Sequence, residues 1–183
     1  MREDQLDTSI LSWQPKEFMR SDSSVADTLR CELAAEVLQV FGSLYLRVTG
    51  SSMLPSIWPG DTLLIQQLGI KRIVAGDIVL FEREGRLFAH RVISVTGTPE
   101  QPLLMTQGDA LRTPDGLVSE TELLGKVSRI LRGQKRIEPL RRPGLCSRLS
   151  VDLIRHSAWA ARLLLRLYSI RTHFWKREEP CSS

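Results

Sequence analysis

Between residues 43 and 132 the chain is a series of short apolar runs, each bounded by Gly, Pro or Asp. Short apolar runs with this punctuation are typical of β-strands. The strands predicted on this basis cover residues 43–48, 62–65, 77–81, 86–95, 103–106 and 123–131. Glu84-Gly85 is a plausible hairpin turn between two of them. The pattern predicts a mostly β fold, with a largely antiparallel, partly closed sheet and flanking helices.

The segment before the predicted strands has the periodicity of a helix. Leu29, Leu33, Val37 and Val40 recur at helical spacing, which predicts one amphipathic helix over residues 25–42. We expect its apolar face to cover the β core, and contact with a membrane or a partner is the alternative. The preceding residues 1–24 are polar, which predicts a flexible segment.

The last part of the chain is basic, although the net charge of the whole protein is only +4. Residues 149–175 form a second helical pattern, with Leu153, Leu164 and Tyr168 on one face and Arg155 and Arg162 on another. A charged face over a packed apolar stripe is the first interpretation. Such a helix also suits an anionic membrane surface or a protein partner, whereas nucleic acid is not an expected partner.

These observations divide the 183 residues into one domain with extensions. The predicted parts are a flexible segment 1–24, an amphipathic helix 25–42, a β domain 43–140 and a basic amphipathic tail 141–183.

Residues suited to nucleophilic catalysis lie at the edges of the predicted strands. Ser52 is in a turn closed by Pro55, and His90 is the single histidine of the predicted β domain. Serine needs a neighbouring base to act as a nucleophile, and imidazole changes protonation near neutral pH. Asp109 or Asp115 is a candidate to orient the imidazole, although both are also typical turn aspartates. The sequence leaves open which of the two does so.

These motifs resemble type I signal peptidases. The nucleophile motif of that family corresponds to Ser52-Met53, Pro55 and Gly60-Asp61, and three further matching segments follow in the family's order over residues 44–132. They are Gly76-Asp77 with its apolar strand, His90-Arg91-Val92, and Gly108-Asp109 followed by Leu124-Gly125-Lys126-Val127. Most bacterial members use Lys as the base, so His90 resembles the His-type branch of the endoplasmic reticulum and archaea. Asp115 matches the second aspartate of that branch.

The resemblance implies a fold and an activity for the predicted catalytic β domain. It implies the coiled β fold that signal peptidases share with LexA-like repressors, and a serine endopeptidase that cleaves a peptide or preprotein after small residues. Ser52 would be the nucleophile, His90 the base and Asp115 the third member. Met53 and Leu54 would line the substrate groove, with a place in the apolar core as the equal alternative, and the Ser52 N–H would contribute to the oxyanion hole. Asp61 and Asp77 are expected to cap turns.

The sequence departs from the family in one respect, because no run of about 18 apolar residues is present. The polar N-terminus is also unlike a signal peptide. We therefore expect a cytoplasmic protein or one bound peripherally to a membrane. The odd number of cysteines argues against a disulfide framework. Neither a metal nor a cofactor is expected for Ser/His/Asp chemistry.

Two other functions fit the same fold. A LexA-like self-cleaving regulator would use Lys as its base and carry a DNA-binding helix-turn-helix, whereas this chain has His90 and only a short N-terminal segment. A non-catalytic module that presents its basic tail to a partner is the other alternative. The presence of all three catalytic residue types argues against it.

Overall fold

The computed structural model describes residues 15–141, with side chains described from residue 25 onward. Within this part, a long helix α1 (Pro15–Phe41) precedes a sheet of eight strands. The strands are β1 (Ser43–Arg47), β2 (Thr62–Gln66), β3 (Ile78–Arg83), β4 (Arg86–Gly97), β5 (Pro102–Gln107), β6 (Leu117–Val118), β7 (Leu123–Arg132) and β8 (Lys135–Ile137). A short 3₁₀ helix, η1 (Ile70–Arg72), lies between β2 and β3. The first 14 residues and, apart from Arg141, the predicted tail 141–183 lie outside the described residues.

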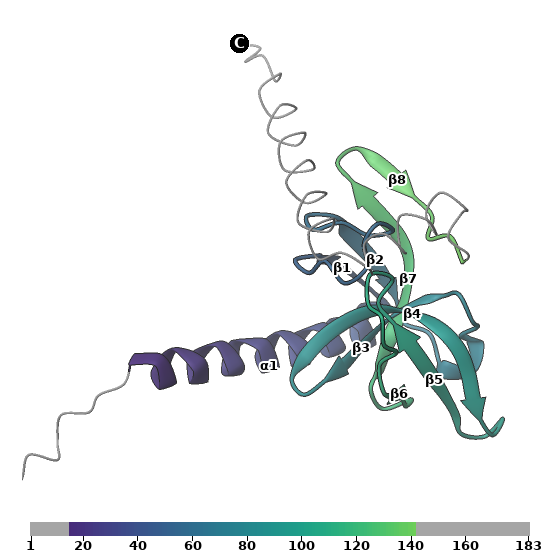
Figure 1. The fold of residues 1–183 in the computed structure, drawn as a ribbon, viewed down its shortest axis with the longest axis horizontal. Coiled ribbons are helices and arrows are strands. Elements are labelled where there is room, and N and C mark those ends of the chain that lie inside the picture. The colour runs from purple at the N-terminus through teal and green to yellow at the C-terminus, as the bar shows by residue number, and fades with distance from the viewer. Residues whose placement is uncertain (1–14, 142–183) are drawn as a thin grey trace, which may run out of the picture.

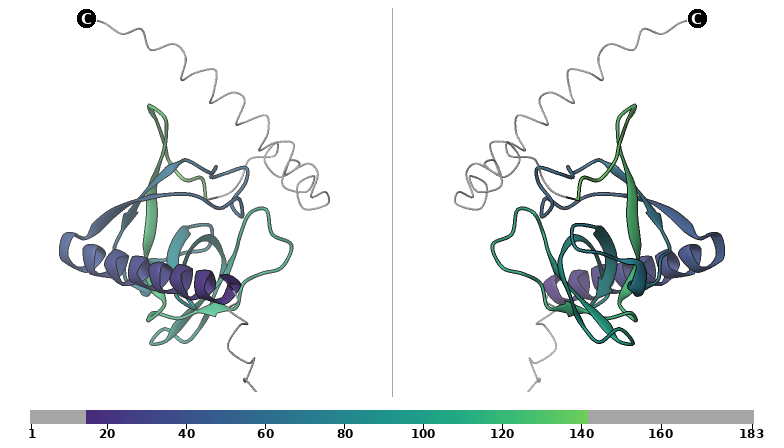
Figure 2. Two further views of the ribbon diagram at one scale, coloured as in Figure 1. Left: turned by 90° about the vertical axis from the view of Figure 1, so that its left-hand side faces the viewer. Right: turned by 90° about the vertical axis from the view of Figure 1, so that its right-hand side faces the viewer.

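The sheet is antiparallel throughout, as the sequence predicted. Its strand order is β1-β2-β7-β3-β4-β5-β6, and β8 pairs with β7 (Figure 1). Three register shifts interrupt the ladders, at Leu64/Ile65, Leu80/Phe81 and Val92/Ser94. Shifts of this kind bend a strand and increase its twist. The sheet is accordingly strongly coiled, and its strands cross at steep angles in the two side views (Figure 2).

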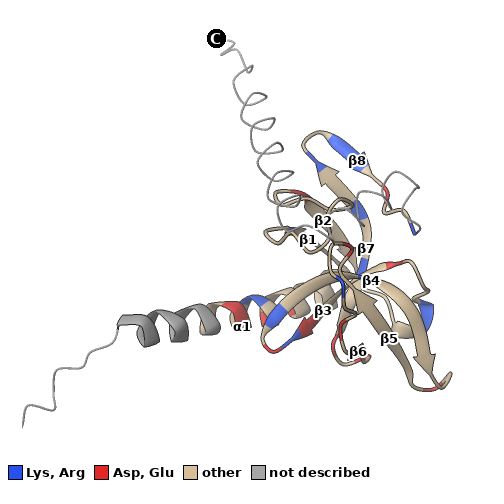
Figure 3. Cartoon of the chain, in the orientation of Figure 1, with Lys and Arg blue, Asp and Glu red and all other residues tan. Residues whose placement is uncertain are grey.

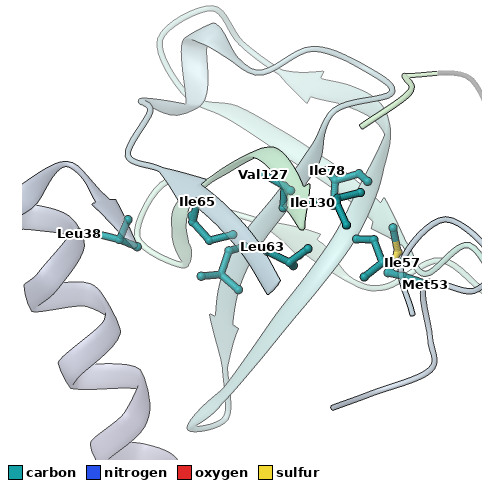
Figure 4. Packing of buried hydrophobic residues seen from close by; sticks show 9 residues of the cluster. Leu38, Met53, Ile57, Leu63, Ile65, Ile78, Val127 and Ile130 are labelled. Atoms are coloured by element: carbon teal, nitrogen blue, oxygen red, sulfur yellow. The ribbon is translucent and has the colours of Figure 1, made fainter. Parts of the chain in front are cut away.

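The core has two apolar clusters, and β3 lies between them. Ile78 and Leu80 belong to one cluster, while Val79 and Phe81 belong to the other. Since alternate residues of a strand point to opposite faces, this explains why the β3 sequence is continuously apolar. The first cluster also contains Leu38, Met53, Ile57, Leu63, Ile65, Val127 and Ile130 (Figure 4).

Helix α1 differs from its prediction in extent and in orientation. It begins at Pro15 and not near residue 25, which suits proline because the first turn of a helix needs no N–H donor there. Among its residues 25–41, the buried side chains are Cys31, Ala34 and Leu38. The helix packs against β1, β4 and β7.

The apolar face that the sequence predicted to cover the core is the wrong one. Leu29, Leu33 and Val40 are 58–67% exposed, and only Val37 of the predicted set is partly buried. Periodicity fixes which residues share a face, but a small residue such as Ala34 permits closer approach to the sheet than the bulkier leucines. The exposed apolar stripe is therefore a surface of the described structure.

Charge is spread unevenly over the described surface. The exposed Lys135 and Arg136 make the β7–β8 hairpin basic, and acidic Glu32 and Glu36 lie on α1 (Figure 3). Within residues 15–141, no helix has both the length and the apolar character that crossing a membrane requires.

Candidate active site

Ser52 lies in the turn-rich loop between β1 and β2. Backbone hydrogen bonds join Val48 N to Asp61 O (2.8 Å) and Gly60 N to Val48 O (2.8 Å), so the two ends of the loop remain paired. The buried Asp61 carboxylate accepts a hydrogen bond from Trp58 N (2.8 Å) and forms an ion pair with Arg132 (2.7 Å). Asp61 thus caps this turn, as the sequence predicted, and fixes the loop that carries Ser52.

His90 lies in the middle of β4, where its side chain is almost fully buried. Its ring contacts Phe81 edge to face, with 6.0 Å between the ring centroids, and Phe88 at 5.8 Å. Phe88 shares the face of β4 with His90 because the two are two residues apart, and Phe81 pairs with Phe88 across the ladder. The aromatic neighbours restrict the imidazole and keep water from most of its surface.

The structure brings Ser52, His90 and Asp115 into one hydrogen-bonded chain. His90 Nε2 is 2.9 Å from Ser52 Oγ, and His90 Nδ1 is 2.7 Å from Asp115 Oδ2. In the tautomer that donates its Nδ1–H to the carboxylate, Nε2 accepts the hydroxyl proton of Ser52. The three residues come from the β1–β2 loop, from β4 and from the β5–β6 loop. This is the arrangement of a nucleophile, a base and an orienting carboxylate.

Asp109, the other candidate carboxylate, contacts a different partner. Its two oxygens accept hydrogen bonds from Nε and Nη2 of the buried Arg91, both at 2.8 Å. Ser56 Oγ donates to the same carboxylate. Arg91 also donates to the carbonyl oxygens of Gly76 (3.0 Å) and Leu140 (2.7 Å). Asp109 therefore lies in a buried network behind the Ser52 loop and not on the imidazole.

A close backbone approach joins the Ser52 loop to the turn after β5. Ala110 N donates to the carbonyl oxygen of Ser52 at 2.8 Å. A Cβ atom on Gly108 would lie only 2.7 Å from that oxygen, which is too close for any side chain. The glycine of the Gly108-Asp109 pair is thus required by the position of the nucleophile.

Met53 and Leu54, which the sequence predicted to line the substrate groove, lie in the core instead. Leu54 is fully buried and Met53 is 4% exposed. Met53 Sδ accepts a hydrogen bond from Asp109 N at 3.5 Å. Of the two alternatives, the core is the one that the structure shows, because the turn after Ser52 directs both side chains inward, where they support the loop.

Asp77, the second predicted turn cap, accepts a hydrogen bond from Val74 N at 3.2 Å. It also pairs with Lys126 (2.9 Å) and Arg141 (3.0 Å). Asp77 is therefore a cap with two cationic partners, away from the Ser52 hydroxyl.

Two residues near the site were not predicted from the sequence. Arg91 was recognised only as the neighbour of His90, and Thr106 only as the end of a strand. Thr106 Oγ1 donates to Asp115 Oδ2 at 2.8 Å. No local pattern marks either residue, because their partners lie nine or more positions away in the sequence. Among the described residues, no three His, Cys, Asp or Glu side chains gather in an arrangement suited to a metal ion.

The sequence was compared with models of known protein families and with curated proteins. A family model described as Peptidase S24-like matches residues 21–127. This match covers most of α1, strand β4 with His90 and the β5–β6 loop with Asp115, and it ends within β7. A comparison with curated proteins found no match.

Proposed function

Because the chain belongs to the Peptidase S24-like family, we propose that it is a serine endopeptidase with Ser52 as nucleophile, His90 as base and Asp115 as the orienting carboxylate. The observation that carries the proposal is the continuous chain from Ser52 Oγ through the imidazole to Asp115, with distances of 2.9 and 2.7 Å. A serine that only capped a turn would have no reason to contact a buried histidine. The geometry thus favours catalysis over a purely structural or binding role.

In the proposed mechanism His90 Nε2 takes the proton of Ser52 as Oγ attacks the scissile carbonyl. Collapse of the tetrahedral intermediate breaks the C–N bond, and the imidazolium gives its proton to the leaving amine. A water molecule, deprotonated by the same Nε2, then hydrolyses the acyl ester and regenerates the Ser52 hydroxyl. Asp115 keeps the Nδ1–H in place and balances the positive charge that His90 carries in between.

The Ser52 N–H is the proposed donor to the developing oxyanion. It donates no hydrogen bond to any residue of the described part of the chain. The hydrogen bond from Ala110 N to Ser52 O fixes the orientation of the nucleophile's peptide units. Gly50, two residues before the nucleophile, supplies no side-chain donor, so a second donor would come from another backbone amide.

The proposed substrate is a peptide or preprotein segment in an extended conformation, cut after a small residue. Strand β1 pairs only with β2 in the described sheet, and it leads directly into the Ser52 loop. An open edge of this kind can accept a peptide as an additional strand. We also propose that the protein acts in the cytoplasm or peripherally at a membrane, with the basic tail 141–183 as the candidate membrane contact.

A LexA-like self-cleaving regulator is the second candidate function, and the family match favours it. Self-cleavage within one chain has a rate that does not depend on protein concentration, whereas cleavage of another molecule does. Intact mass measured over time at several concentrations separates the two. The histidine base favours the endopeptidase, since the self-cleaving relatives use Lys in its place.

The first experiment labels the protein with a serine-reactive phosphonate and counts adducts by intact mass. We expect one adduct on the wild type, none on Ser52→Ala, and a strongly reduced rate for His90→Ala. Ser51→Ala is the matched control, because Ser51 is an exposed neighbour of the same residue type, and it should label normally. Peptides with Ala before the cut then test cleavage. A folded Ser52→Ala variant that still labels or cleaves would refute the assignment.

A further inference from the structure

Thr106 contacts the third member of the proposed triad from the neighbouring strand. It is fully buried near the end of β5, opposite Val92 in the ladder with β4. Its hydroxyl donates to Asp115 Oδ2 at 2.8 Å, and its carbonyl oxygen accepts a hydrogen bond from Asp115 N at 2.8 Å. Thr106 therefore holds both the side chain and the backbone of Asp115.

The oxygen that Thr106 contacts is the one that faces the imidazole. Asp115 Oδ2 accepts from Thr106 Oγ1 and from His90 Nδ1 together. With two donors on one oxygen, the carboxylate has a single orientation in which both hydrogen bonds are short. A rotation of the Asp115 side chain would break both contacts at once.

Asp115 depends on such an anchor because of where it lies. It is in the β5–β6 loop, outside any strand or helix, and its neighbours Pro114 and Gly116 are exposed. His90, in contrast, is fixed by β4 and by two aromatic rings. The Asp115 carboxylate is thus held by hydrogen bonds and not by a strand of its own, and Thr106 is the strand residue that bonds it directly.

We infer that Thr106 is a positioning residue that holds Asp115 on His90 and thereby sets the rate of catalysis at Ser52. This inference rests on the proposed peptidase function. A buried threonine hydroxyl needs a hydrogen-bond acceptor wherever it lies. Asp115 is the acceptor here, and the effect of removing the hydroxyl should therefore reach catalysis through the carboxylate.

The kinetic test compares Thr106→Val, which keeps the shape and removes the hydroxyl, with Thr106→Ser, which keeps the hydroxyl. We expect Thr106→Val to lower kcat about tenfold with little change in KM, and Thr106→Ser to retain most of the activity. In an Asp115→Asn background Thr106→Val should cause little further loss, because residues that act together are not additive. Thr96→Val, an exposed strand threonine on β4, is the control for the substitution itself.

A spectroscopic test does not depend on substrate or turnover. In a chain with His156→Asn and His173→Asn, His90 is the only histidine, and its Nδ1 proton toward Asp115 should give a low-field proton NMR signal. We expect Thr106→Val to shift or broaden this signal and Thr106→Ser to preserve it. If the protein cleaves nothing, the proposed function fails while this measurement still decides the role of Thr106. An unchanged NMR signal in Thr106→Val would overturn the inference. So would equal losses of kcat in Thr106→Val and Thr106→Ser, or a loss of kcat in the Thr106→Val, Asp115→Asn double variant equal to the two single losses combined.

Discussion

Arg91 and Asp109 form a buried ion pair in which two guanidinium nitrogens each donate to a different carboxylate oxygen at 2.8 Å. The residue before Arg91 is His90, whose ring faces Asp115 instead. Neighbouring residues on β4 thus engage two different aspartates. One pair supports the framework of the Ser52 loop, and the other belongs to the proposed catalytic chain.

This division predicts different kinetic effects for the two aspartates. Asp115→Asn should lower kcat by about 10²- to 10⁴-fold with a small change in melting temperature, because it removes the negative charge that balances the imidazolium and introduces an NH2 group that favours the wrong imidazole tautomer. Asp109→Asn should affect kcat less, once only folded protein is counted. Active-site titration combined with peptide cleavage measures both. A larger loss per folded molecule for Asp109→Asn would exchange the two roles.

The same ion pair predicts a large effect on stability. Asp109→Asn leaves the Arg91 charge buried without a counter-charge, so we expect the free energy of unfolding to fall by about 3–5 kcal/mol. Asp27→Asn is the matched control, because its pair with Arg30 is exposed and should contribute at most about 1 kcal/mol. Urea unfolding followed by circular dichroism measures the difference. Similar losses for both variants would contradict the structural role of Asp109.

The contact between Gly108 and Ser52 predicts a defect from a single added methyl group. A Cβ at residue 108 would meet Ser52 O at 2.7 Å, so Gly108→Ala must displace the nucleophile loop or the turn after β5. We expect it to reduce probe labelling of Ser52 at least tenfold. Gly69→Ala is the control, since an added Cβ there meets nothing within 4 Å. Normal labelling of Gly108→Ala would show that the close contact between residue 108 and Ser52 O is not required for a reactive Ser52.

The orientation of α1 predicts which of its leucines stabilise the domain. Leu38 is 1% exposed in the first core cluster, so Leu38→Ala should destabilise the protein by about 2–5 kcal/mol. Leu33 is 58% exposed, and Leu33→Ala should cost less than about 0.5 kcal/mol. Thermal unfolding of the two variants distinguishes these faces. A larger loss of stability for Leu33→Ala than for Leu38→Ala would mean that the face predicted from the sequence, which contains Leu33, is the buried one.

Glu122 predicts a pH-dependent contribution to stability. Burial acts to raise the pKa of this carboxyl, but hydrogen bonds from Ser119 and Arg83 outweigh it, and the pKa is lowered overall. Arg83 Nε is 2.8 Å from Glu122 Oε1. A lowered pKa in the folded state means that the charged form stabilises the fold above the pKa of the unfolded chain. That stability is lost as the pH falls through the folded pKa.

We therefore expect Glu122→Gln to destabilise the protein at neutral pH by about 1 kcal/mol or less. The difference from the wild type should shrink as the pH falls below the pKa that an ordinary glutamate has. Unfolding in urea at neutral and acidic pH measures it. A difference that grows toward acid pH would have the wrong sign for this mechanism.

The sequence by itself determined the strands, the turns and the types of residue at the site. Short apolar runs bounded by Gly, Pro and Asp place the strands because backbone geometry and burial act locally. All six predicted strand regions are strands in the structure, and Ser52 and Asp115 lie in loops beside them, whereas His90 lies within β4 and not at its edge. Asp61 and Asp77 likewise cap turns within three residues of themselves.

The tertiary structure decided what depends on distant contacts. Asp109 and Asp115 both follow β5 and look alike as turn aspartates, and only the coiling of the sheet directs one to Arg91 and the other to His90. The role of Thr106, the inward direction of Leu54 and the buried face of α1 have the same origin. Periodicity identifies which residues share a face, but which face is buried depends on shape complementarity with strands far away in the sequence.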